Sequence, residues 1–86
     1  MEIYYRDLRP YFNVIDIRER LDYEQGHYLN SINIPYILLL NNPSKYMVKN
    51  IKYYLYCYSG NKSKKACDLL RILGYDVVNV IDGYNK

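Results

Sequence analysis

The chain has 86 residues, a formal net charge of +3 and 24% charged residues, which fits one small folded domain and excludes several domains within these residues. No apolar run approaches the roughly 20 residues that cross a bilayer, and the N-terminus is too charged for a signal peptide, so we expect a cytoplasmic protein. Two cysteines, Cys57 and Cys67, do not suffice for a disulfide framework.

Predicted strands and helices alternate in the first half of the chain. We expect short strands over residues 3–5 and 32–34 and a mainly apolar strand over 12–17. Helices are expected over 18–24 and 36–40, the second ended by the Asn-Asn-Pro sequence that follows.

The second half continues this alternation. A β-branched and aromatic strand is expected over 51–57 and another over 76–81. The helix between them has apolar residues at helical spacing and ends at Gly74. Strands that alternate with helices and are apolar on both faces indicate a parallel sheet covered on two sides, with ligands beyond the carboxyl ends of its strands. Cys57 lies at such an end.

The segment after Cys57 has the composition of an anion-binding loop. If residues 58–63 curl into a loop that leads into a helix, their N–H groups and the helix dipole favour an anion at the cysteine. A thiol there would ionise well below its usual pKa of about 8.5. Gly60 permits a tight turn, Ser59 and Ser63 supply hydroxyl groups, and Lys62 supplies a cation. The sequence therefore predicts a reactive thiolate.

Thirteen tyrosines are many for a chain of this length. We interpret most of them as strand and surface residues rather than as a platform on which nucleic-acid bases stack. Direct binding of nucleic acid is therefore not expected, and the modest charge does not require it.

Three segments resemble the rhodanese-like domains. CYSGNKS at residues 57–63, with the helix after it, resembles their active-site loop, written C-x-x-G-x-R-S. Residues 14–35 are similar to the family's Asp-x-Arg strand, Gly-His pair and closing Ile-Pro, and residues 79–84 to its last strand and Gly-Gly-Tyr turn. The matches occur in the family's order over nearly the whole chain.

The resemblance implies a single α/β domain over residues 1–86, with a three-layer α/β/α rhodanese-like fold and a five-stranded parallel sheet. It implies a sulfurtransferase of the thiosulfate:cyanide type or a persulfide carrier, in which Cys57 takes a sulfane sulfur from thiosulfate or a protein persulfide and passes it to a thiol or to cyanide. The persulfide is covalent, so no cofactor, metal or membrane partner is expected. The implied cradle around Cys57 consists of Tyr58, Ser59, Gly60, Asn61, Lys62 and Ser63.

Some residues depart from the family pattern or have supporting roles. Lys62 replaces the loop arginine and Asp82 the first glycine of the last turn. Many members continue after this turn, so we expect a minimal fold truncated at the C-terminus. Asp16 and Arg18 are expected to tie their strand end to neighbouring backbone or to Asp22 and Glu24, and His27 to be a hydrogen-bonded turn residue. Cys67 is expected to be a small core residue rather than a resolving thiol.

Two alternatives remain. The first is a non-catalytic rhodanese-like module for binding or regulation, although such modules often lack the cysteine. The second is a phosphatase or arsenate reductase of the same fold, whose loops generally place one more residue between the cysteine and the cation. The shorter spacing from Cys57 to Lys62 favours sulfur chemistry over phosphate chemistry.

Overall fold

The computed structural model describes residues 1–84. Its five strands are β1 (Glu2–Ile3), β2 (Asn13–Asp16), β3 (Ile32–Asn33), β4 (Lys52–Tyr56) and β5 (Asp76–Val80). Its helices are α1 (Arg20–Gln25), α2 (Tyr36–Asn41) and α3 (Asn61–Ile72), with 3-10 turns η1 (Tyr5–Asp7) and η2 (Pro43–Lys45). Within residues 1–84, none of the helices has the length and apolar character that a membrane span requires.

All five strands pair in parallel in one sheet, in the order β1-β5-β4-β2-β3. The expected α/β fold with a five-stranded parallel sheet is confirmed. The central strand β4 pairs with β2 on one side and β5 on the other, so that Leu55 lies beside both Ile15 and Asn79. The carboxyl end of β4 is therefore enclosed by two neighbouring strands.

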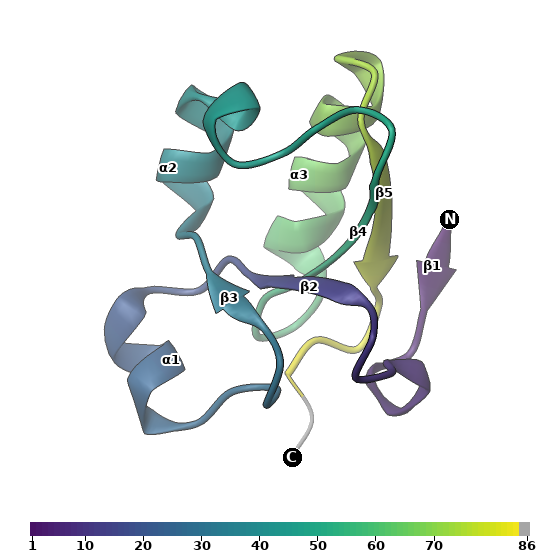
Figure 1. The fold of residues 1–86 in the computed structure, drawn as a ribbon. Coiled ribbons are helices and arrows are strands. Elements are labelled where there is room, and N and C mark those ends of the chain that lie inside the picture. The colour runs from purple at the N-terminus through teal and green to yellow at the C-terminus, as the bar shows by residue number, and fades with distance from the viewer. Residues whose placement is uncertain (85–86) are drawn as a thin grey trace.

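One face of the sheet is covered by α2 and α3, which pack side by side (Figure 1). Alternate residues of the strands point toward these helices, as the period-two geometry of a strand requires. Ile15, Leu55 and Val77 meet Leu39 of α2 and Leu70 of α3 in a buried apolar cluster. Burial of this cluster is the main source of the fold's stability.

The opposite face is covered by η1 and by aromatic side chains. Tyr5 of η1 makes edge-to-face contacts with Tyr28, Tyr56 and Tyr84, at ring-centroid distances of 5.6, 6.0 and 5.8 Å. Edge-to-face pairs add stability beyond the area that they bury. Several tyrosines that the sequence analysis assigned to strands and the surface thus form the second core layer.

The helix boundaries differ from prediction at two functional positions. The helix expected from residue 18 begins at Arg20, because Arg18 turns back to bind Asp16. The helix after Cys57 begins at Asn61, so residues 61–63 form its first turn and not a loop. The cause is Gly60, whose φ of 90° turns the chain directly into α3. The expected truncation at Lys86 lies outside the described residues.

Candidate active site

Cys57 directly follows β4 and is the residue around which the next segment folds. Its Sγ accepts hydrogen bonds from the backbone N–H of Gly60 at 3.2 Å and of Ser63 at 3.4 Å. The Ser63 hydroxyl oxygen lies 3.4 Å from the same sulfur. The arrangement is a set of donors converging on one sulfur atom, at the N-terminus of a twelve-residue helix.

These contacts set the acidity of the thiol. Burial acts to raise the pKa of Cys57, but hydrogen bonds from the Ser63 side chain and from the backbone of Ser63, Gly60 and Ser59 outweigh it and lower the pKa below the ordinary value. Donors stabilise a thiolate more than a neutral thiol. Cys57 is therefore predisposed to be a nucleophile.

Cys67 contrasts with Cys57. It lies on the inner face of α3, fully buried in the core, and burial raises its pKa to about 12. A thiol of that acidity remains protonated and unreactive at neutral pH. Its position is that of the small core residue expected from the sequence.

The turn at Cys57 depends on two close backbone approaches. A Cβ atom at Gly60 would overlap the carbonyl oxygen of Ile81, and one at Gly83 would overlap the carbonyl oxygen of Tyr58. Both glycines have positive φ, 90° and 70°. The last turn of the chain is thus packed against the Cys57 loop, which explains why both segments carry glycine.

A buried amide supports the loop from below. Asn79 of β5 is 2% exposed, and its Oδ1 accepts a hydrogen bond of 2.5 Å from the Ser63 hydroxyl. Its Nδ2 lies 3.5 Å from the carbonyl oxygen of Gly60. The sequence analysis missed this residue, although one amide within the apolar segment Val77–Val80 was a usable signal.

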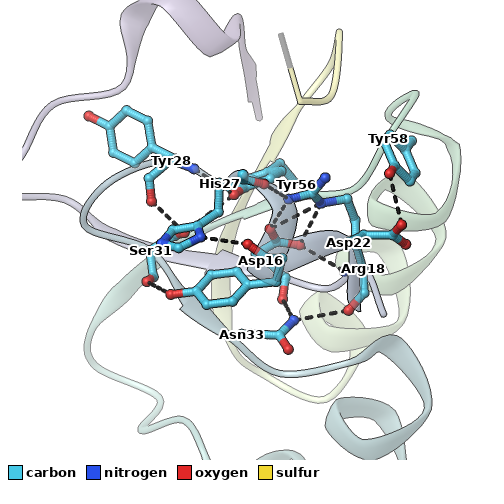
Figure 2. A network of polar contacts seen from close by, with 11 residues as sticks. Asp16, Arg18, Asp22, His27, Tyr28, Ser31, Asn33, Tyr56 and Tyr58 are labelled. Carbon is cyan, nitrogen blue, oxygen red and sulfur yellow. Dashed lines mark hydrogen bonds and ion pairs between the residues drawn. The ribbon is translucent and has the colours of Figure 1, made fainter. Parts of the chain in front are cut away.

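Asp16 and Arg18 form a buried ion pair beside the site. The guanidinium donates to both carboxylate oxygens, with Nη2 2.7 Å from Oδ2 (Figure 2). The same Nη2 also donates to the carbonyl oxygen of Gly26 at 2.7 Å. Of the two ties expected from the sequence, the one to neighbouring backbone is confirmed by the Gly26 contact and by the hydrogen bond of 2.9 Å from the Arg18 N–H to Asp16 Oδ1, whereas the ion pair of Arg18 is with Asp16 and not with Asp22 or Glu24. Arg18 lies two residues after Asp16 and folds back onto it, while Glu24 pairs with Arg20.

His27 holds a turn after α1. Its Nδ1 is 2.7 Å from the carbonyl oxygen of Tyr23, and its ring stacks on that tyrosine at a centroid distance of 3.7 Å. This is the hydrogen-bonded turn histidine that the sequence indicated. Within residues 1–84 no group of three or more His, Cys, Asp and Glu side chains is placed to hold a metal.

Tyr58 links the loop to α1. Its hydroxyl donates to Oδ1 of Asp22 at 2.9 Å, and its ring lies 5.0 Å from the guanidinium carbon of Arg18 (Figure 2). The hydrogen bond to Asp22 raises the pKa of Tyr58, so the phenol stays neutral at neutral pH. Tyr58, the first residue after the cysteine, thus connects the loop to α1.

An open pocket of about 250 Å³ leads to Cys57. Lys62 contributes to its wall and places its Nζ 5.6 Å from the centre of the Tyr36 ring. The structure therefore brings Cys57, Tyr58, Ser59, Asn61, Lys62 and Arg18 to one pocket, with Gly60 and Ser63 directly beneath the sulfur. Of the predicted site residues, Asp16 and His27 do not line this pocket: Asp16 holds Arg18, and His27 holds the turn after α1.

Comparison with known proteins places these features in a family. A family model described as a rhodanese-like domain matches residues 5–86. Over 72 residues the chain is 29% identical to the putative sulfur carrier protein YrkF of Bacillus subtilis, and over 78 residues 36% identical to the adenylyltransferase and sulfurtransferase uba4 of Ogataea parapolymorpha. These matches cover 83% and 90% of this chain but only 38% and 20% of those proteins.

Solved structures agree. A rhodanese-related protein from Thermoplasma volcanium superposes with a TM-score of 0.75 at 36% identity, covering 84% of this chain and 71% of that one. A rhodanese-like domain protein from Staphylococcus aureus gives a TM-score of 0.77 at 28% identity, over 90% and 74%. A structure described as rhodanese with anions from E. coli gives 0.70 at 32% identity, over 78% and 81%.

Proposed function

This chain belongs to the rhodanese-like domain family, which includes relatives named as sulfur carrier and sulfurtransferase, and on that premise we propose that it transfers sulfur through a persulfide on Cys57. The observation that carries the proposal is the convergence of the Gly60 N–H and the Ser63 N–H on one sulfur atom, with the Ser63 hydroxyl oxygen 3.4 Å from it. Such donors stabilise the thiolate that attacks and the anion that forms.

Loading is a nucleophilic displacement at sulfur. The Cys57 thiolate attacks the outer sulfur of thiosulfate, a new S–S bond forms, and the old S–S bond breaks so that sulfite leaves with the bonding electron pair. The product is a Cys57 persulfide anion. Its outer sulfur extends into the pocket, where the N-terminus of α3 favours negative charge.

Discharge is the same displacement directed at the outer sulfur. A nucleophilic acceptor, cyanide or a thiolate, attacks that sulfur, and the Cys57 thiolate departs with the electron pair. The donors that held the starting thiolate hold the leaving group, so each step begins and ends with a stabilised anion. No metal or organic cofactor takes part in the proposed cycle.

Two other functions fit less well. In a phosphatase or arsenate reductase of this fold the cradle generally has one residue more, whereas here the cation Lys62 stands five positions after Cys57 and Ser63 lies beneath the sulfur. A binding module has no use for a thiol of lowered pKa surrounded by donors. These observations favour sulfur transfer.

The test is the intact mass of the protein after incubation with thiosulfate or a small persulfide, before and after cyanide is added. We expect a gain of one sulfur atom that cyanide removes and that Cys57→Ser abolishes, while Cys67→Ser leaves it nearly unchanged. Equal losses in the two variants would contradict the assigned roles. No gain from any donor, in folded protein with a free Cys57 thiol, would favour the binding module.

A further inference from the structure

The walls of the Cys57 pocket carry opposite charges. Glu19 and Asp22, at the start of α1, line one part of the pocket, and Lys62 of α3 lines another. Glu19 and Lys62 are solvent-exposed, and Asp22 is half-buried. A molecule reaching the sulfur therefore passes between two carboxylates and one ammonium group.

Arg18 also lines the pocket but does not add a free positive charge to it. Its guanidinium is 2.7 Å from the fully buried Asp16 carboxylate and is enclosed by the rings of Tyr58 and Tyr84, at 5.0 and 4.2 Å from their centroids. The ion pair is neutral as a unit. The charges that face a ligand are then those of Glu19, Asp22 and Lys62, with a net negative sign.

This charge pattern is unfavourable for a small dianion. Thiosulfate would be attracted by Lys62 and the helix N-terminus but repelled by both carboxylates. A zwitterion has a partner for each wall, its ammonium group toward Glu19 and Asp22 and its carboxylate toward Lys62. The pocket volume of about 250 Å³ is smaller than that of sites for drug-sized ligands, which suits an amino acid.

We propose that the preferred small sulfur donor is the persulfide of an α-amino thiol, such as cysteine persulfide, held through its ammonium group by Glu19 and Asp22. This inference rests on the proposed function. The Cys57 thiolate attacks the outer sulfur of R–S–S–H, a new S–S bond to Cys57 forms, and the S–S bond of the donor breaks with the electron pair going to R–S⁻. The proton of the transferred sulfur then passes to that thiolate. R–SH is released, and Cys57 carries a persulfide anion.

The experiment compares two donors that differ in one charge, cysteine persulfide and N-acetylcysteine persulfide, with thiosulfate as a third. Rates of loading onto Cys57 are measured by intact mass for wild type and for the double variant Glu19→Gln, Asp22→Asn. Both amides keep the shape of the acids, and the amide oxygen introduced at position 22 can still accept from Tyr58. Glu24→Gln, which removes one carboxylate of α1 outside this pocket, is the control for a general loss of negative charge.

We expect wild type to load cysteine persulfide about three to ten times faster than its N-acetyl form, the size of one or two partly exposed ion pairs. The preference should vanish in the double variant, in which thiosulfate should load faster, and should persist in Glu24→Gln. Equal rates for the two persulfides in wild type, or a preference that survives the double substitution, would overturn the inference while leaving sulfur transfer intact. Failure of all three donors would instead overturn the proposed function and the inference with it.

Discussion

The Ser63 hydroxyl oxygen lies 2.5 Å from Oδ1 of Asn79, and both residues are buried. This contact joins the first turn of α3 to β5, directly beneath the sulfur of Cys57. Asn79 also lies 3.5 Å from the Gly60 carbonyl oxygen through Nδ2. One amide therefore supports Gly60 and Ser63, two residues whose N–H groups donate to the sulfur.

Asn79→Ala should destabilise the protein by about 2 kcal/mol, because it removes the buried hydrogen bond from Ser63 and leaves a cavity where the amide packed. Urea denaturation measures the change. Asn13→Ala is the control, since Asn13 is exposed and makes one long hydrogen bond to the Lys52 carbonyl, and it should cost less than about 0.5 kcal/mol. Similar losses for both variants would show that Asn79 has no special supporting role.

Cys57 and its cradle were predictable from the sequence because their arrangement is local. A thiol at the end of an apolar strand, followed within three residues by glycine and then by a helix, determines most of the geometry. The tie between Tyr58 and Asp22 was not predictable, because it depends on how α1 lies against the loop across 36 residues of sequence. The same holds for Asn79, which reaches Ser63 only once β5 pairs with β4.

Arg18 illustrates a different limit of prediction from the sequence. The sequence suggested neighbouring backbone or two acids of the following helix as its partners, but the carboxylate of Asp16 is buried at the strand end and pairs with Arg18, the nearest cation along the chain. Burial of a carboxylate is costly without a partner. Burial is a property of the assembled sheet, and the sequence alone does not show which of several acids becomes buried.

The Ser63 hydroxyl should contribute to the acidity of Cys57. Ser63→Ala removes the side-chain hydrogen bond but keeps the backbone one, so the pKa of Cys57 should rise. The pH profile of alkylation by iodoacetamide, followed by intact mass in a Cys67→Ala background, should shift to higher pH. The rate should fall at neutral pH and converge with that of the parent well above the usual thiol pKa of about 8.5.

Ser59→Ala is the comparison, because only the backbone of Ser59 acts on the sulfur. It should shift the profile less than Ser63→Ala does. A larger shift for Ser59→Ala would contradict the assigned hydrogen bond from Ser63.

Cys67 should make the protein less stable at alkaline pH. Its folded pKa of about 12 lies above the unfolded value, so above the unfolded pKa the unfolded chain loses a proton that the folded chain keeps. Stability therefore falls as pH rises, by about 1 kcal/mol between roughly pH 8 and 9.5. Urea denaturation at both pH values, in a Cys57→Ser background, measures this loss, and adding Cys67→Ala should abolish it. An unchanged slope would show that another group causes it.

Alanine substitutions at Gly60 and Gly74 separate two costs, the overlap of a Cβ atom with a neighbouring backbone and the strain of a positive φ. Both have positive φ, 90° and 97°, so alanine is strained at either position. At Gly74 a Cβ would make its nearest contacts with the Lys49 side chain, at an ordinary 3.6 Å, whereas at Gly60 it would overlap the Ile81 carbonyl oxygen. Gly74→Ala should cost about 1 kcal/mol, while Gly60→Ala should cost at least about 3 kcal/mol and abolish sulfur loading. Equal costs would show that the contact with Ile81 is unimportant.

Lys62→Arg tests what the cation of the loop does. Lysine presents a single point charge, whereas the planar guanidinium of arginine can pair with two oxygens of an oxyanion at once. If Lys62 acts as a weak oxyanion clamp, Lys62→Arg should load sulfur from thiosulfate about two to five times faster than wild type, by the strength of one added charged hydrogen bond at an exposed site. Lys65→Arg, on the exposed surface of the same helix, controls for a general effect of arginine. An unchanged or slower rate for Lys62→Arg would contradict the clamp and leave the charge of Lys62, rather than its geometry, as the feature that a donor recognises.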